Sequence, residues 1–131
     1  MKYEGSVKGI KVVLYPNSFA VVNVRNVPNV DFFAMVKDKR GVTVVLPESE
    51  LRKICDILLG CEGGFRLLTF DTILPFDLVG FISKISTALA KAGIGILVFS
   101  SYSTDHILIK ENDVERALEV LEGLGFERVI L

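Results

Sequence analysis

GILVFSSYSTDHILIK, residues 95–110, decides the fold that we predict for this chain. Residues 95–101 and 106–110 are rich in aliphatic side chains and are typical of strands. Between them lies a run of hydroxyl side chains that ends in one acid, Asp105, which is typical of a turn. Two apolar strands joined by a polar turn form a sheet edge that can bind a ligand.

The segments around this stretch alternate between strand and helix patterns. Residues 65–74 are typical of an apolar strand, and residues 78–92 have the periodicity of an amphipathic helix, with Asp77 as its candidate N-cap. A last strand is predicted over residues 126–131. A second helix precedes it, with the apolar stripe Val114, Ala117, Leu118 and Leu121. The order strand, helix, strand, strand, helix, strand predicts a ferredoxin-like α+β fold: an antiparallel sheet with helices on one face.

The first half of the chain has weaker patterns. Residues 11–15 and 19–24 are β-branched runs on either side of Pro16-Asn17-Ser18, so we expect a β-hairpin. Residues 29–37 have the spacing of a short helix, and residues 42–46 are typical of a strand.

A helix and a glycine-rich break complete this half. The helix follows Pro47, and its apolar face includes Cys55, which we expect to be buried. Residues 60–64, GCEGG, form the clearest break in composition and predict a linker. We therefore expect a shortened half over residues 1–59, the linker over 60–64 and a complete half over 65–131.

Composition limits the classes of function. The 131 residues are 50% hydrophobic with a formal net charge of -1, which supplies a core but no basic excess for a nucleic-acid partner. No apolar run is long enough to span a membrane, and we see no export signal. With two cysteines, Cys55 and Cys61, and one histidine, neither a disulfide framework nor a metal site is expected. We expect a protein of the reducing cytoplasm.

The segment after the strand over 65–74 excludes several activities of this fold. It contains no Arg or Lys to hold a phosphoryl group and no thiols to carry copper. The strand that begins at His106 is aliphatic rather than aromatic, which argues against an RNA-binding sheet. No nucleophile and base pair is apparent. We therefore expect no enzyme activity and no cofactor.

The same edge of the sheet suits a free amino acid. The amino end of the helix over 78–92 offers N–H groups for a carboxylate, and Asp105 offers a partner for an ammonium group. Two other roles remain open at this point. In the first, Asp105 and the hydroxyls of Ser100, Ser101 and Thr104 form hydrogen bonds within the turn and contact no ligand. In the second, Asp77 caps the helix and contacts no ligand. His106 is expected to be a packing residue rather than a base.

The motifs in the second half resemble those of a known family. They are FDLVGFI at 76–82, LAKAGIGI at 89–96, SSYSTDHILIKEND at 100–113, and the A-L-x-x-L pattern that begins at Ala117 and is followed by Gly125. This part of the chain resembles the paired ACT-domain proteins, whose eukaryotic members include cytosolic arginine sensors. The first half resembles, less distinctly, the shortened unit that precedes it in that family. The resemblance implies two ferredoxin-like ACT-type halves, the first shortened.

The resemblance also implies a ligand site. It implies an amino acid bound between ACT-like units, at the segment 75–80 and at the turn before His106. The expected ligand-binding residues are Pro75, Phe76, Asp77, Leu78, Val79, Gly80, Ser100, Ser101, Tyr102, Thr104 and Asp105. The arginine sensors carry an acidic residue at the position of Leu78 and a glycine at that of Pro75. These differences remove a partner for a guanidinium group and a backbone donor, so two options stay open: a less basic amino acid, or no ligand at all.

Two functions are therefore carried forward. The first is a non-enzymatic regulatory module that binds a small ligand, a free amino acid, and forms a homodimer or docks onto a partner protein. The alternative is a structural module of protein–protein assembly, with the same ferredoxin-like fold and no bound ligand. Two-sided apolar strands such as residues 65–74 suit both functions.

Overall fold

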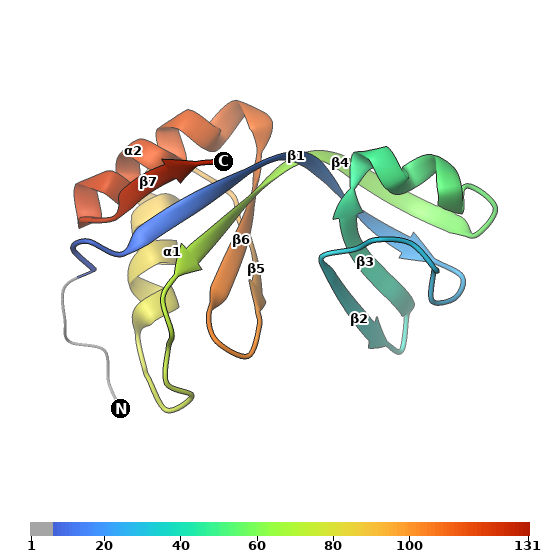
Figure 1. Ribbon diagram of the computed structural model, residues 1–131, viewed down its shortest axis with the longest axis horizontal. Helices are drawn as coiled ribbons and strands as arrows, with labels where there is room; N and C mark the ends of the chain where they lie inside the picture. Colours follow the sequence, from blue (N-terminus) through green and yellow to red (C-terminus); the bar gives the residue numbers. More distant parts are fainter. Residues whose placement is uncertain (1–6) are drawn as a thin grey trace. The chain divides into compact units, whose positions relative to one another are not determined.

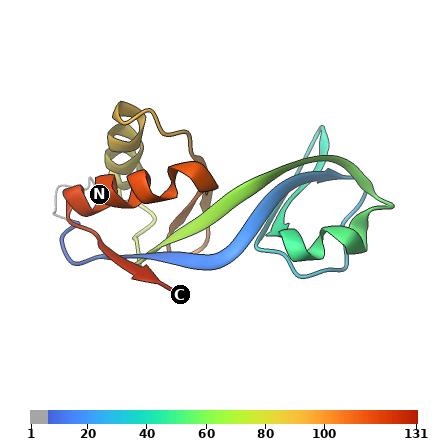
Figure 2. The same ribbon diagram turned by 90° about the horizontal axis from the view of Figure 1, so that it is seen from above.

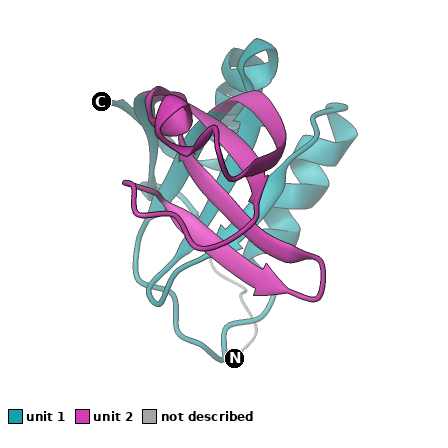
Figure 3. Cartoon of the chain, turned by 90° about the vertical axis from the view of Figure 1, so that its right-hand side faces the viewer, with its two compact units in different colours: residues 1–16, 66–131 teal, residues 17–65 magenta. Residues whose placement is uncertain are grey.

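The computed structural model describes residues 7–131, and the chain divides into two compact units (Figure 3). Unit 1 consists of residues 1–16 and 66–131, and unit 2 consists of residues 17–65. Strands β1 (Lys11–Val24) and β4 (Leu58–Asp71) each contribute residues to both units. Among the described residues, no helix is long and apolar enough to cross a membrane.

Unit 1 is a sheet in the order β7-β1-β4-β6-β5, with two helices (Figure 1). Strands β5 and β6 are antiparallel, with Leu97 opposite Leu108 and Ser100 opposite Asp105. Strand β7 instead runs parallel to β1, with Lys11 opposite Glu127, which the sequence patterns did not predict. Besides its parts of β1 and β4, unit 1 contains α1 (Phe81–Lys91), β5 (Leu97–Ser100), β6 (Asp105–Lys110), the 3-10 helix η2 (Glu111–Asp113), α2 (Val114–Leu124) and β7 (Glu127–Ile130).

Helices α1 and α2 cover one face of this sheet (Figures 1 and 2). Their apolar stripes pack on strand residues such as Leu68 and Phe70 of β4 and Ile107 of β6. The Phe70 ring contacts Phe81 edge-on, with ring centres 5.7 Å apart. Each aliphatic side chain buried here contributes roughly 1.5–3 kcal/mol. The predicted helices on one face of the sheet are thus confirmed for unit 1.

Unit 2 contains β2, β3 and parts of β1 and β4, in the sheet order β2-β3-β1-β4. The second part of β1 pairs with β3 (Gly41–Pro47), which pairs in turn with β2 (Ala34–Asp38). The 3-10 helix η1 (Glu48–Ile54) closes the core through Ile54, which is buried among valines of β1 and β3. The apolar core of unit 2 consists of Ala20, Val22, Val24, Val42, Val44, Leu46 and Ile54.

The predicted hairpin at Pro16 is wrong, because β1 is a single strand of 14 residues. Its first part, Lys11 to Leu14, pairs with β7, and its second part, Phe19 to Val24, pairs with β3. Pro16 lies outside both ladders, so its missing N–H interrupts neither of them.

The predicted helix over residues 29–37 is also wrong. Residues 34–38 form β2, because a tight turn places Asp38 opposite Gly41 and lets β2 pair along β3. The Arg40 amide donates to the Asp38 carboxylate at 2.8 Å, and Gly41 has a φ of 122°, which favours glycine. Long-range pairing outweighs the local helical spacing here.

Residues 60–64 form part of β4 rather than the expected linker. The glycines allow a close approach by Glu48, whose carboxylate oxygen would lie 3.2 Å from a Cβ at Gly63 and accepts the Gly64 amide at 3.1 Å. The two units therefore do not follow the predicted boundaries. Cys55 is exposed rather than buried, because η1 ends before it and its side chain lies outside the core.

Candidate functional site

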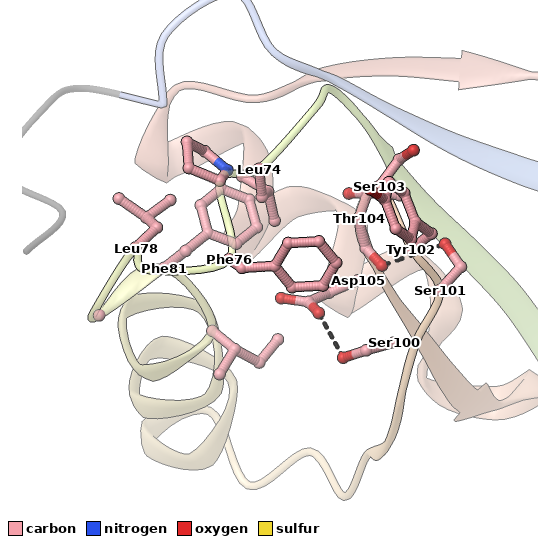
Figure 4. Close-up of a pocket in the computed structure, with 13 residues that line it drawn as sticks. Leu74, Phe76, Leu78, Phe81, Ser100, Ser101, Tyr102, Ser103, Thr104 and Asp105 are labelled. Carbon is pink, nitrogen blue, oxygen red and sulfur yellow. Dashed lines mark hydrogen bonds between the residues drawn. The ribbon is translucent and has the colours of Figure 1, made fainter. Parts of the chain in front are cut away.

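Two segments of unit 1 enclose a cavity of about 230 Å³ (Figure 4). One consists of the end of the loop between β4 and α1 and the first two residues of α1, which we call the loop wall, residues 74–82. The other is the turn between β5 and β6, which we call the turn wall, residues 100–105. The cavity is lined by Leu74, Pro75, Phe76, Leu78, Gly80, Phe81, Ile82, Ser100, Ser101, Tyr102, Ser103, Thr104 and Asp105.

The turn wall is closed by hydrogen bonds at its base. The Ser101 amide donates to the Thr104 carbonyl at 2.9 Å. The Ser100 hydroxyl donates to the Asp105 carboxylate at 2.6 Å, across the last pair of the β5–β6 ladder (Figure 4). The carboxylate of Asp105 is thereby held in place at the cavity.

The turn wall is also attached to the chain at the end of β4. The Thr104 hydroxyl donates to the Phe70 carbonyl at 2.7 Å, and the Leu74 amide donates to the Ser103 carbonyl at 2.7 Å. The hydroxyls of Ser100 and Thr104, both predicted ligand contacts, therefore donate within the protein. These bonds give the turn a fixed shape.

His106, buried at the start of β6, lies behind the turn wall. Its Nδ1 lies 2.7 Å from the Thr69 hydroxyl and its Nε2 lies 3.0 Å from the Ser101 hydroxyl. Because Ser101 donates its proton to the Thr104 carbonyl at 3.3 Å, the network assigns the imidazole proton to Nε2, with Nδ1 accepting from Thr69. Sequence reasoning placed His106 as a packing residue and missed these bonds.

Burial favours the neutral form of this imidazole. Loss of solvent lowers the pKa of His106 below its ordinary value, and the neighbouring carboxylate of Asp105 opposes that shift. A neutral ring fits a network in which one nitrogen donates and the other accepts.

The loop wall has a different backbone. The Leu78 amide bonds to the Pro75 carbonyl at 3.1 Å, and the chain then takes a φ of 102° at Gly80, which favours glycine. Helix α1 begins at Phe81, with Gly80 rather than Asp77 as its N-cap and without a side-chain cap. The predicted Asp77 cap is therefore wrong, because the turn at Gly80 starts the helix later. The first-turn amides of an α-helix have no partner within the helix and can donate hydrogen bonds to an anion.

Two aromatic rings meet where the walls approach one another (Figure 4). The Phe76 and Tyr102 rings lie edge to face, with centres 5.0 Å apart and planes at 82°. Both residues are largely solvent-exposed, at 78% and 82%. Large aromatic side chains so exposed beside a cavity are available to cover a ligand.

The cavity brings together most of the predicted site residues. Asp77 and Val79 do not line it, whereas the others do. Leu74, Phe81, Ile82 and Ser103 also line it and were not predicted as site residues. Phe81 and Ile82 were placed on the apolar stripe of a helix, and the pattern carries no sign that the first turn of that helix also faces a cavity.

Asp105 is the sole charged side chain among the lining residues. The remainder are apolar side chains, hydroxyls and glycine. Within residues 7–131, no group of three or more His, Cys, Asp or Glu side chains is arranged to hold a metal ion. The cavity thus combines one fixed negative charge with hydroxyl groups and apolar side chains.

Comparison with solved structures shows a shared fold. An Agrobacterium tumefaciens protein superposes with a TM-score of 0.79 at 22% identity, covering 94% of each chain. The aspartokinase α and β subunits give 0.69 at 19% identity, covering 87% of this chain and 96% of theirs. The ligand-free regulatory subunit of Thermus thermophilus aspartate kinase gives 0.62 at 12% identity, covering 89% of this chain and 99% of its own.

Sequence comparison extends the likeness to a family. Subunit 1 of the bovine (Bos taurus) cytosolic arginine sensor for mTORC1 is 29% identical over 105 residues, which cover 74% of this chain. The chain spans 32% of that relative's length. Residues 61–123, which include both walls of the cavity, match the ACT domain model. The resemblance found in the sequence motifs is therefore confirmed for this part of the chain, which is similar to ACT domains.

Proposed function

We propose that this protein is a non-enzymatic regulatory module that binds a free amino acid in the cavity of unit 1. The observation that carries the proposal is the pairing of the fixed Asp105 carboxylate with the first turn of α1 at one cavity. Regulation then consists of a change in stability or assembly when the amino acid binds.

The two walls complement the two charges that every free amino acid carries. An α-ammonium group pairs with Asp105 through a charge-assisted hydrogen bond. An α-carboxylate suits the amino end of α1, where the helix dipole is positive and where Gly80 and Ile82 line the cavity.

The family and the relatives support this proposal. The bovine relative is an arginine sensor by name, and one structural neighbour is the regulatory subunit of an aspartate kinase. We extend from them a regulatory role in the cytoplasm, in which the chain acts as a homodimer or docks onto a partner protein. Two further points remain predictions from the resemblance: that residues 1–59 form a shortened ACT-type half, and that ligands bind between ACT-like units.

A thermal-shift screen of the twenty amino acids at millimolar concentration tests this function. A ligand at 100 times its Kd stabilises the folded state by about 2.7 kcal/mol, which raises Tm by several degrees. We expect at least one amino acid to raise Tm, and Asp105→Ala to abolish the rise. Unchanged Tm values for all twenty would reject the proposal.

A structural assembly module is the second candidate, and two observations favour it. Strand β5 lies at the edge of the sheet of unit 1 and exposes Leu97 and Val98. The Ser100 and Thr104 hydroxyls already have partners in the protein. If the chain is such an assembly module, Val98→Asp converts a dimer to a monomer in analytical ultracentrifugation. No amino acid then changes Tm or the dimer dissociation constant.

A further inference from the structure

The charges of the cavity restrict the side chain of its ligand. Once the ammonium group of an amino acid has paired with Asp105, no second carboxylate among the lining residues remains for a cationic side chain. No lysine or arginine lines the cavity either, so an acidic side chain also lacks a partner. An ion that leaves water without a partner loses binding free energy.

The part of the lining that comes from the loop wall is suited to an apolar group. Leu74, Leu78 and Ile82 present aliphatic side chains, and Pro75 and Phe81 add further apolar surface. At the rim, the exposed rings of Phe76 and Tyr102 would each lose water contact when an apolar ligand is covered.

The size of the cavity points to a small ligand. Its volume of about 230 Å³ is below the ~300–1,000 Å³ typical of pockets for drug-sized molecules. A single amino acid is a ligand of this smaller class, whereas a peptide or a nucleotide is not.

We propose that the ligand is an amino acid with an uncharged, apolar side chain, of the class of leucine, isoleucine, methionine and phenylalanine. This inference rests on the proposed function and narrows it. It separates this chain from the bovine relative, which is a sensor of arginine by name. Asp105 binds the ammonium group, the first turn of α1 binds the carboxylate, and the apolar lining with the two rim rings surrounds the side chain.

Isothermal titration calorimetry with L-leucine, L-phenylalanine, L-arginine and L-glutamate tests the side-chain class. We expect a leucine or phenylalanine Kd at least about tenfold lower than that of either charged amino acid, because the charged side chains find no partner. An arginine or glutamate Kd equal to or below both apolar values overturns the inference and leaves the proposed function standing. Failure of all four, and of the full set of twenty, overturns both.

Leucine analogues that each lack one head group test the two charged contacts. 4-Methylpentanoate lacks the ammonium group, and 3-methylbutylamine lacks the carboxylate. We expect each to bind at least about tenfold more weakly than leucine, since each removes one charge-assisted contact. An amine that binds as tightly as leucine overturns the amino-acid assignment.

A matched pair of variants locates the ammonium contact. Asp105→Asn keeps an oxygen that can accept the Ser100 hydroxyl but removes the charge, and we expect the leucine Kd to rise at least about tenfold. Glu119→Gln removes one negative charge from α2, at an exposed residue that does not line the cavity, and we expect less than a twofold change. Equal effects of the two variants overturn the assignment of Asp105.

Discussion

The two walls of the cavity differ in how they are held. The turn wall, residues 100–105, is fixed by hydrogen bonds of Ser100, Ser101 and Thr104, and by the buried ring of His106 behind it. In the loop wall, residues 74–82, the Leu78 amide donates to the Pro75 carbonyl, the Leu74 amide donates to Ser103, and the Gly80 carbonyl accepts from Lys84. Phe76 and Val79 of the loop wall are exposed.

This difference assigns a role to each wall. Hydrogen bonds that are already formed hold Asp105 ready without any ordering at the moment of binding. A segment with exposed apolar side chains gains the most when a ligand covers those side chains. We therefore expect substitutions in the turn wall to change mainly the free energy of unfolding, and substitutions in the loop wall to change mainly the Kd of the ligand.

The largest expected effect is that of the ring behind the turn wall. His106→Leu removes both imidazole bonds and leaves Thr69 and Ser101 without this partner, which should lower the free energy of unfolding by about 2–3 kcal/mol at pH 8. His106→Gln keeps one donor and one acceptor and should recover part of that loss. Urea denaturation of the wild type and the two variants measures the free energy of unfolding. A loss below about 0.5 kcal/mol in His106→Leu would contradict the role given to His106.

The same residue makes stability depend on pH. Because the pKa of His106 is lowered in the folded state, the unfolded chain takes up its proton first, near the ordinary value of about 6.5. The free energy of unfolding should be level above that pH and fall as pH drops below it, by at most about 1.4 kcal/mol per pH unit. His106 is the chain's one histidine, so His106→Leu should remove this slope between pH 5.5 and 6.5. A slope that persists in the variant would assign it to other groups.

A smaller effect is expected from the bond between the turn wall and β4. Thr104→Val keeps the shape of the side chain but removes the bond to the Phe70 carbonyl, which should cost about 1 kcal/mol of stability. The control is Ser103→Ala, which keeps the backbone carbonyl that holds Leu74 and should change stability by less than about 0.5 kcal/mol. Equal losses in the two variants would show that the turn is not held through Thr104.

The smallest change in stability is expected at the rim. Phe76→Ala removes an exposed ring and should alter the free energy of unfolding by less than about 0.5 kcal/mol. The same variant should raise the leucine Kd several-fold, because the ring no longer covers the ligand. A leucine Kd that does not change would remove Phe76 from the site.

The parts of the fold that follow local periodicity could be predicted from the sequence. The stripe from Val114 to Leu121 and the apolar run after Asp105 appear in the structure as α2 and β6, since each buries one continuous face. The conformations of residues 29–37 and of the segment at Pro16 could not be predicted from the sequence, because pairing with distant strands decides them. Cys55 was misplaced because η1 is a 3-10 helix, whose residues do not repeat at α-helical spacing.

The site shows the same division. Both walls were predicted as parts of the site because each follows the end of a predicted strand. Segments that follow strand ends can lie side by side at one edge of a sheet. Asp77 was taken as a helix cap because the positive φ of Gly80, which moves the helix start, leaves no pattern in the sequence beyond the glycine itself. The hydrogen bond between His106 and Thr69 joins residues far apart in the chain, and no spacing rule predicts it.

The most direct test of the central claim is a titration of the ¹⁵N-labelled protein with each of the twenty amino acids, followed by backbone amide NMR. We expect at least one apolar amino acid to shift amides of residues 74–82 and 100–105, with the larger shifts in the loop wall. No shift at either wall with any amino acid, or shifts confined to residues 17–65, would contradict an amino-acid site at this cavity.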